Sequence, residues 1–294
     1  MNVARSRRSL TEAQVNPDEI EKLLQRIGRI EAGIEDLKRL IGDHVIYRDQ
    51  IQYRDLLLLL DRAVHWRGKE EAHIETEYPV AIASHDHLFP RGTVNDNTRY
   101  PRFVKACERV MGRKLTALDL GCAGGGLVLE FLLEGHRAFG VEGSDMSAKS
   151  LRAEWRLLAD RLFTADATKP FAIMEGADRL AFNLICAWEV MEHIPEHLLP
   201  GLLHNVTGHL APDGLFVGSV AMFPDEDPTT GAVWHVTLRE KTWWRDRFAD
   251  AGLEMLEDHG FEPRDFPRGN PHGQYLADFV ANPDMGFHFV CRAQ

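Results

Sequence analysis

A glycine-rich segment in the middle of the chain has the residue types of a ligand-binding turn. It runs from Leu118 as LDLGCAGGG, so a short apolar run ends in the acid Asp119 and is followed by small residues. Small residues let the backbone turn tightly and approach a ligand before a helix begins. A second apolar run ends in Glu142, near the spacing at which a dinucleotide site binds its ribose. The pattern G-x-A-x-x-G from Gly121 also loosely matches a dinucleotide fingerprint, so these residues alone leave the ligand open.

An alternation of strands and helices must position these residues. From about residue 102 onwards this alternation predicts an α/β domain, in which a parallel sheet has helices on both faces. The expected strands are 115–120, 137–141, 161–165, 181–187, 214–221 and 287–291. The expected helices are 127–134, 147–158, 196–210 and 237–251. A capping box at Thr237 is expected to open the last helix, and Gly252 to end it.

Five motifs follow one another in the order of a large enzyme superfamily. Residues 118–126, 139–145, 164–167, 185–193 and 210–214 resemble the successive motifs of class I S-adenosylmethionine (SAM)-dependent methyltransferases. Ala123 replaces the middle glycine of the first motif, and Asp213 departs from the last. The E-x-x-E-H version of the fourth motif is similar to that of the small-molecule O-methyltransferases of ubiquinone biosynthesis. The resemblance covers about half of the chain and implies a Rossmann-like sheet.

The resemblance also implies which residues bind SAM. Glu142 would accept hydrogen bonds from both ribose hydroxyls, and Asp166 from the adenine amino group. Asp119 would lie near the amino group and the sulfonium, where a carboxylate is electrostatically favourable. In an empty site we expect Glu142 to face solvent. The residues assigned to the cofactor are Asp119, Gly121, Ala123, Gly125, Glu142, Gly143, Asp166, Ala167 and Trp188.

Four side chains that we expect to lie where the methyl acceptor binds resemble a metal site. Glu189, Glu192 and His193 are spaced i, i+3 and i+4, so they project from one face if residues 189–193 form a helical turn. With His235 they resemble the metal-binding pattern of small-RNA 2′-O-methyltransferases and of some quinone-pathway O-methyltransferases. A divalent ion there would hold two adjacent acceptor oxygens and lower the pKa of the attacking one. Mixed histidine and carboxylate ligation suits Mn²⁺, Fe²⁺ or Zn²⁺ better than Mg²⁺.

The same histidines have a second interpretation without a metal. Many relatives carry E-x-x-E-H only to shape the end of the fourth strand. His193 or His235 is then the natural general base, because imidazole titrates near neutral pH. The surroundings of His235 and the long N-terminal arm resemble enzymes that methylate sugars of natural products or surface polysaccharides. The sequence therefore predicts an O-methyltransferase of a small molecule, with a sugar as the preferred acceptor and residues 259–285 as a substrate lid.

Two functions of other classes also fit parts of the sequence. An NAD-type dinucleotide-binding oxidoreductase fits the glycine turn, although such a turn presents helix amides to a pyrophosphate, which SAM lacks. A coiled-coil interaction protein with a degenerate methyltransferase fold fits the N-terminal arm. Against this second alternative, Asp119, Glu142 and Asp166 are intact.

Residues 1–75 are expected to form a helical arm, followed by a turn-rich linker over 76–101 and the catalytic domain over 102–294. Within the arm, the segment 16–45 begins with Asn16 as N-cap and Pro17 at the first helical position. Its apolar heptad repeat favours a two-stranded coiled coil and hence a homo-oligomer. Its glycines favour the alternative, a helix packed on its own domain. The repeating positions are Ile20, Ile27, Ile34 and Ile41, with Leu23, Ile30, Leu37 and His44 three residues on.

The composition limits the partners and the compartment. The formal net charge of −11 disfavours a broad nucleic-acid surface, which needs basic residues to displace counterions. The four cysteines include no CxxC pair, which suits a reducing compartment. No apolar region follows the N-terminal arginines, and the leucines at 56–60 fall short of the ~20 apolar residues that span a bilayer. We therefore expect a cytoplasmic protein without a membrane span.

Overall fold

The structure of the chain is a computed structural model that describes residues 72–269 and 278–294, together with Glu21 and Gln25. All sites discussed below lie in one compact unit, Leu57–Gln294. Glu21 and Gln25 are helical, and the rest of the heptad segment 16–45 lies outside the described residues. The coiled coil and the homo-oligomer therefore stay predictions. In the described ranges, no helix has the length and apolar character needed to cross a membrane.

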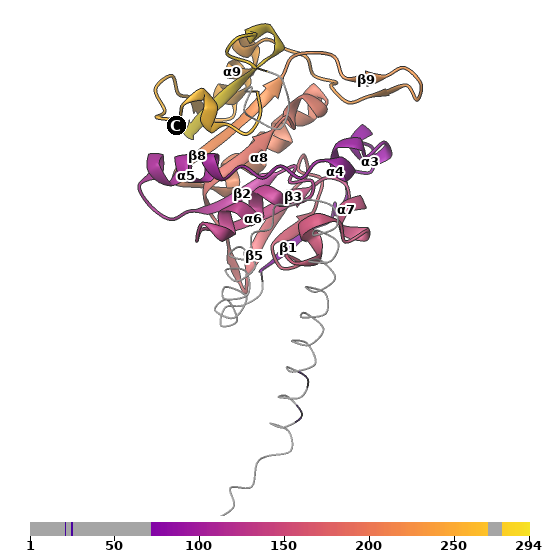
Figure 1. Ribbon diagram of the computed structural model, residues 1–294, viewed down its shortest axis with the longest axis vertical. Helices are drawn as coiled ribbons and strands as arrows, with labels where there is room; N and C mark the ends of the chain where they lie inside the picture. The colour runs from indigo at the N-terminus through magenta and orange to yellow at the C-terminus, as the bar shows by residue number, and fades with distance from the viewer. Residues whose placement is uncertain (1–20, 22–24, 26–71, 270–277) are drawn as a thin grey trace, which may run out of the picture. The chain divides into compact units, whose positions relative to one another are not determined.

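A seven-stranded sheet forms the centre of this unit (Figure 1). Its strands are β2 (Thr116–Leu120), β3 (Arg137–Glu142), β4 (Leu162–Thr164), β7 (Phe182–Trp188), β8 (Leu210–Ala221), β11 (Leu253–Met255) and β12 (Gly286–Ala293). They are arranged in the order β11-β12-β8-β7-β2-β3-β4. The five strands from β8 to β4 run parallel, whereas β12 is antiparallel to both of its neighbours. The predicted Rossmann-like sheet is thus confirmed, but it is mixed and not parallel throughout.

Helices cover both faces of this sheet. On one face lie α5 (Pro101–Met111) and α6 (Gly126–Leu133), and on the other α8 (Leu199–His209) and α9 (Lys241–Asp250). Neighbouring residues of a strand point to opposite faces. Ala117 and Leu118 of β2 accordingly belong to different hydrophobic clusters. Because both faces are covered, the central strands are nearly continuous apolar runs.

The parallel strands end level with one another along one edge of the sheet. Leu120 of β2 pairs with Val141 of β3 and with Ala187 of β7. Trp188, the last residue of β7, pairs with Ser219 of β8. The turns that follow these strands therefore open on the same edge, and the predicted site residues lie in them or at the strand ends.

A second, smaller sheet was not predicted. It consists of β1 (Ala72–Thr76), β5 (Phe171–Glu175) and β6 (Asp178–Arg179), in the order β1-β5-β6. β1 pairs antiparallel with β5, so that Ala72 faces Glu175 and Thr76 faces Phe171. Residues 72–75, expected as the end of a helical arm, are therefore a strand of the same unit as the catalytic sheet.

Two predicted helices differ from those observed. The helix expected at 147–158 is broken into α7 (Met146–Lys149) and η1 (Ala153–Arg156). The break coincides with Leu151 and Ala153, whose φ values of 48° and 47° lie in the left-handed region that interrupts a right-handed helix. The capping box at Thr237 is also wrong, because α9 begins at Lys241. The Thr237 hydroxyl donates instead to the carbonyl of Ile194 at 2.6 Å.

The expected linker, 76–101, contains two short helices, α3 (His85–Leu88) and α4 (Arg91–Asn95). It lies along the carboxyl edge of the sheet: the Ala81 N–H donates to Gly143, and the Gly124 N–H donates to the carbonyl of Asp96. Beyond β8, a small hairpin of β9 (Glu226–Asp227) and β10 (Ala232–Val233) extends from the body (Figure 1). The remaining elements are η2 (Met191–His193), η3 (Glu196–Leu198), η4 (Pro263–Asp265) and η5 (Pro283–Met285).

Candidate active site

The turn between β2 and α6 has the backbone that close ligand approach requires. Gly121 has a φ of 72° and Gly125 a φ of 86°, in the left-handed region that glycine adopts readily. A Cβ on Gly121 would lie only 2.5 Å from Cγ2 of Val190. Ala123 also has a positive φ, 44°, and its N–H donates to Glu142 at 2.8 Å. The alanine that replaces the middle glycine of the motif is therefore held by a hydrogen bond to the second predicted acid.

Glu142, at the end of β3, accepts hydrogen bonds from three protein donors. Its Oε2 accepts from the Ala123 N–H at 2.8 Å, and its Oε1 from the Thr93 hydroxyl at 3.1 Å and the Ser144 N–H at 3.2 Å. The expectation that Glu142 faces solvent is wrong, because it is only 6% exposed. Burial raises its pKa, and the hydrogen bonds from Ser144 and Ala123 oppose that rise. Since a carboxylate has about four acceptor sites, three donors leave capacity for a ligand hydroxyl.

Asp166, directly after β4, is held in a turn of its own. Its Oδ1 accepts from the N–H of Thr168 at 2.9 Å and from the Thr168 hydroxyl at 2.6 Å. The Asp166 N–H donates to the carbonyl of Tyr78, and Gly143 accepts from Ala81. The segment before α3 thus spans the ends of β3 and β4, where the sequence predicts adenine to bind.

Asp119 lies at the end of β2 and is 7% exposed. Burial raises its pKa well above the usual range, and the nearby charges of Asp96 and Glu142 raise it further. The positive charge of Arg268 opposes this rise. Asp119 is therefore a buried carboxyl among other acids, which is an environment that favours a bound positive group.

Two further residues predicted to bind the cofactor have partners within the protein. The ring of Trp188 packs edge-on against Phe103 at a centroid distance of 4.9 Å and against Phe266 at 5.9 Å. The carbonyl of Ala167 accepts from the side-chain amide of Asn205 at 2.8 Å. Trp188 belongs to the hydrophobic core on the α5 face, and its role at the cofactor stays a prediction.

On the acceptor side, Glu192 is fully buried within η2. Its Oε1 accepts from the N–H of Ala221, at the end of β8, at 2.8 Å. Its Oε2 is buried and makes no hydrogen bond to the described residues. Burial raises the pKa of Glu192 to about 8. A buried carboxylate oxygen without a donor is costly unless a proton or a cation satisfies it.

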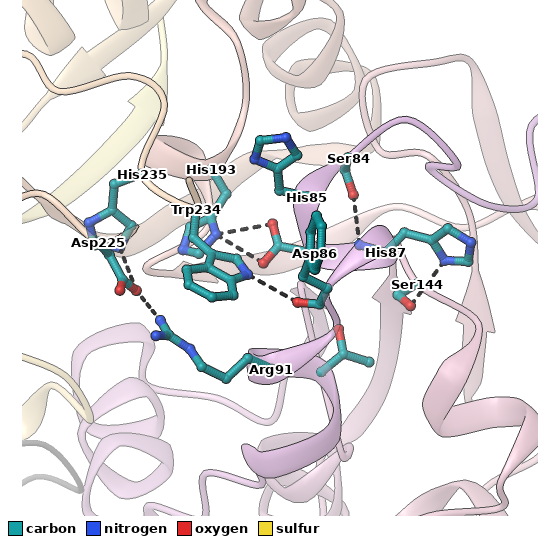
Figure 2. Close-up of polar contacts among 12 residues, drawn as sticks. Ser84, His85, Asp86, His87, Arg91, Ser144, His193, Asp225, Trp234 and His235 are labelled. Carbon is teal, nitrogen blue, oxygen red and sulfur yellow. Dashed lines mark hydrogen bonds and ion pairs between the residues drawn. The ribbon is translucent and has the colours of Figure 1, made fainter. Parts of the chain in front are cut away.

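The ring of His193 is oriented by Asp86, which reaches it from α3 (Figure 2). Nδ1 of His193 lies 3.0 Å from both carboxylate oxygens of Asp86, which places the proton on Nδ1 and directs it at the acid. Burial lowers the pKa of His193, but the hydrogen bond and charge of Asp86, together with the charge of Glu192, raise it to about 9. Nε2 remains as the second ring nitrogen, on the side away from Asp86.

His235 lies directly beside His193, with ring centroids 5.0 Å apart. Its Nδ1 is 2.6 Å from the carbonyl of Phe223, so Nδ1–H donates there and Nε2 carries the lone pair. Burial lowers the pKa of His235. Glu192, His193 and His235 each offer one ligand atom, and these atoms all lie within 4.8 Å of one another.

Glu189 is not part of this group of three. The expected helical turn over 189–193 is wrong, because Glu189 has a φ of 54° and only 191–193 form a 3-10 turn. The Glu189 N–H donates to the carbonyl of Ser219, which continues the pairing of β7 with β8. The side chain remains close enough for the charges of Arg268 and His193 to lower its pKa, although burial raises it.

Residues 84–97, which sequence reasoning did not assign to the site, lie beside the three residues together with residues 222–236, which carry His235. Arg91 of α4 pairs with Asp225, and its guanidinium lies 3.9 Å from the ring centroid of Trp234 (Figure 2). The Trp234 Nε1–H donates to the carbonyl of Phe89 at 3.0 Å. Asp225 also lies 3.9 Å from Nε2 of His235. Residues 84–97 and 222–236 therefore contact each other beside Glu192, His193 and His235.

The residues that sequence reasoning missed come mainly from the expected linker. Asp86, Thr93 and Asp96 all contact predicted site residues, or segments that carry them, yet they lie in a stretch that is turn-rich by composition. One signal was available: His85, Asp86 and His87 are three consecutive titratable residues in that stretch. The roles of the missed residues depend on tertiary contacts that are distant along the chain, as with the 107 residues between Asp86 and His193.

Residues 93–264, more than half of the chain, match the family described as methyltransferase domain. Among curated proteins, none matches the sequence. Similar solved structures include a TehB-like SAM-dependent methyltransferase from Corynebacterium glutamicum, with 16% identity, 70% of this chain and 95% of that chain covered, and a TM-score of 0.45.

Two other similar structures are methyltransferases by their descriptions. The 1,6-didemethyltoxoflavin-N1-methyltransferase of Burkholderia thailandensis has 15% identity, with 71% of this chain and 84% of that chain covered and a TM-score of 0.45. The glycopeptide N-methyltransferase MtfA has 15% identity, with 67% of this chain and 94% of that chain covered and a TM-score of 0.44. The family match favours neither the oxidoreductase nor the coiled-coil scaffold considered from the sequence.

Proposed function

The chain belongs to the methyltransferase domain family and is a SAM-dependent methyltransferase, and from this premise we propose that it methylates a hydroxyl oxygen of a small molecule with the help of a divalent metal ion. The residues at the cofactor edge suit SAM. Asp119, Glu142 and Asp166 lie at the carboxyl ends of β2, β3 and β4, and the glycine turn follows β2. Asp119 would face the positive end of SAM, Glu142 its ribose and Asp166 its adenine.

The observation that supports a metal site is the proximity of Glu192, His193 and His235. One potential ligand atom of each residue lies within 4.8 Å of those of the other two. Both rings use Nδ1 for hydrogen bonds, to Asp86 and to the carbonyl of Phe223, so each directs Nε2 away from those partners. Metal-binding histidines are commonly fixed in this way by a carboxylate or a carbonyl. Oε2 of Glu192, buried without a hydrogen bond to the described residues, supplies the third ligand.

Two histidines and one carboxylate are the ligand set of ions such as Fe²⁺, Mn²⁺ and Zn²⁺, and three protein ligands leave further positions open. When bound, the ion would act as a Lewis acid that lowers the pKa of the acceptor hydroxyl. Such an ion would favour an acceptor with two adjacent hydroxyls, such as a vicinal diol of a sugar. Residues 84–97 and 222–236 contact each other beside the three residues, which favours a small acceptor.

The reaction is an in-line displacement at the methyl carbon. The acceptor oxygen forms a bond to that carbon while the bond from carbon to the sulfonium sulfur breaks, and S-adenosylhomocysteine leaves as a neutral thioether. The hydroxyl proton passes to solvent. The protein contributes chiefly by holding the two reactants in line, which can account for most of the acceleration.

An alternative mechanism without metal rests on the ring of His235, whose Nδ1 lies 2.6 Å from the carbonyl of Phe223, so that Nε2 is left as the acceptor. Burial lowers the pKa of His235, so its Nε2 can accept a proton near pH 7. The pKa of His193, raised to about 9, leaves that ring protonated at the same pH when no ion is bound. His235 is therefore the better general base of the two, and His193 would stabilise charge.

The test is a methyl-transfer assay with labelled SAM against sugars with vicinal diols, catechols and amines. Chelation should lower turnover by about 10²–10³-fold without changing SAM affinity, and Mn²⁺, Fe²⁺ or Zn²⁺ should restore it. The Glu192→Gln variant should behave like the chelated enzyme. Its matched control is Glu196→Gln, since Glu196 lies four residues on, with a side chain 42% exposed and paired with Arg239. Full activity in chelator, with no metal found by elemental analysis, would refute the metal and support His235 as base.

A further inference from the structure

Arg268 and Asp96 form a buried ion pair beside the glycine turn. The two residues are 172 positions apart, and their side chains are 6% and 18% exposed. The backbone of Asp96 is anchored to the glycine turn, because its carbonyl accepts from the Gly124 N–H at 3.2 Å. Arg268 therefore brings a positive charge from the expected lid, 259–285, to the turn that follows β2.

Two further acids lie near this ion pair. Asp119 and Glu189 are buried, which raises the pKa of each, and both lie within the electrostatic reach of Arg268, whose charge opposes that rise. Acids there suit the ammonium and sulfonium groups of SAM, but they repel the carboxylate at the same end of the molecule. A ligand that carries both signs needs a cation beside the acids, and Arg268 supplies one.

The side chain of Arg268 also has the right chemistry for two partners at once. A guanidinium presents five donors in a planar fork, so one edge can hold Asp96 while another binds a second carboxylate. Arg152 lies at the same turn, but its Nε and Nη2 donate to the carbonyl of Thr93 at 3.2 and 2.9 Å. Its fork is thus directed at the backbone of residues 93–96, which makes it a support for that segment.

We propose that Arg268 is a SAM-binding residue whose guanidinium binds the carboxylate of the methionine part, with Asp96 as the residue that positions it. The inference rests on the SAM dependence of the proposed function and not on the metal. It gives Arg268 a part in cofactor binding, whereas the sequence suggested that residues 259–285, of which 270–277 lie outside the described residues, form a substrate lid.

The test compares SAM with decarboxylated SAM, which lacks only the carboxylate, by calorimetric titration of the full-length protein. In Arg268→Gln, SAM should bind about tenfold to a hundredfold more weakly, the range for a charge-assisted, bidentate contact. Decarboxylated SAM should bind equally well to parent and variant. Arg268→Lys should recover part of the SAM affinity, since a charge remains but the fork is lost.

Arg264→Gln is the matched control, because Arg264 lies in the same segment, has a side chain 59% exposed and pairs with Glu262. It should bind both ligands as the parent does. An equal loss of both ligands in Arg268→Gln, or an unchanged preference between them, would overturn the proposal. If Arg268→Gln does not fold, the outcome rests on Arg268→Lys and Asp96→Asn, in which only SAM should weaken. The assay contains neither acceptor nor metal, so its outcome is independent of the proposed O-methylation.

Discussion

Glu142, at the end of the site proposed to bind the cofactor (the cofactor end), and Glu192, at the end proposed to bind the methyl acceptor (the acceptor end), are both buried glutamates. They are held differently. Both carboxylate oxygens of Glu142 accept hydrogen bonds from the protein. Glu192 uses one oxygen for the Ala221 N–H, and its other oxygen has no donor among the described residues. The cofactor end is therefore satisfied before a ligand binds. The acceptor end is complete only with a proton or a cation.

The two ends also differ in how they are assembled. At the cofactor end, Asp119, Glu142 and Asp166 each lie at or directly after a strand of the parallel sheet, so the sheet itself brings them together. At the acceptor end, Asp86 and His235 come from segments outside the sheet, on either side of η2. The cofactor end is thus a property of the fold, whereas the acceptor end depends on how two loops pack.

The largest effect should come from removing the incomplete carboxylate. We expect Glu192→Gln to lower turnover by about 10²–10³-fold, the range for the loss of one group that stabilises charge at a reacting oxygen. The affinity for SAM should not change, because Glu192 lies beyond β7 and β8 and not at the glycine turn. Turnover and the dissociation constant of SAM, measured on the same preparation, check this. If turnover and SAM affinity fell together, Glu192 would act on cofactor binding as well as on the acceptor.

Next in size is the effect of Asp86, which orients His193 without belonging to the group of three. Asp86→Asn should weaken metal affinity or activity by about 10–100-fold, as is usual for the partner of a metal-binding histidine. SAM affinity should again be unchanged. Asp178→Asn, at an exposed position of β6, is the control and should have no effect. Metal titration monitored by activity gives the comparison, and an Asp86→Asn enzyme with the parent's metal affinity would contradict the orienting role.

Sequence reasoning predicted the strands that carry the cofactor end because their signals are local. Strand ends, the glycine turn and the acids after each strand are all visible as short patterns, and the sheet they predict is present. The same reasoning missed the sheet of β1, β5 and β6. The pairing of Ala72 with Glu175 joins segments about 100 residues apart, and no local pattern records such a partner.

The acceptor end was predicted only in part for a related reason. Glu192, His193 and His235 were identified, but the helical turn expected to include Glu189 was not formed. Residues with positive φ that are not glycine, such as Glu189 and Leu151, interrupt helices without any sign in the sequence. Asp86 was missed because it orients His193 through a contact between α3 and η2 that no local pattern predicts.

A smaller effect is expected at the cofactor end, on both stability and binding. Glu142→Ala removes the acceptor of the buried Ala123 N–H and of Ser144, so the free energy of unfolding should fall by about 1–3 kcal/mol. SAM affinity should also fall by about 1–3 kcal/mol, because the ribose loses a charged acceptor. Denaturant unfolding and calorimetric titration measure the two quantities. A variant with unchanged SAM affinity would remove Glu142 from the cofactor site.

The smallest expected effect concerns how the stability of the folded protein depends on pH. We compare the parent with Glu192→Gln, both free of metal. Burial raises the pKa of Glu192 from its ordinary 4.5 to about 8. Between these values the folded protein keeps a proton that the unfolded chain has lost, so stability falls as pH rises. Glutamine imitates the protonated acid at every pH and does not share this loss.

We therefore expect the two proteins to have similar melting temperatures near pH 5, and the parent to fall below the variant as the pH approaches 8. A difference of 1 kcal/mol shifts the melting temperature of a protein of about this size by only about 2–4 °C, so the scans must be made side by side in chelator. Added Mn²⁺ or Zn²⁺ should reverse the order, because the ion replaces the proton on Glu192 and binds more tightly as the pH rises. If melting temperature depends on pH in the same way for both proteins in chelator, then the oxygen of Glu192 that has no donor among the described residues does not reduce stability. The proposed difference between Glu142 and Glu192 would then be wrong.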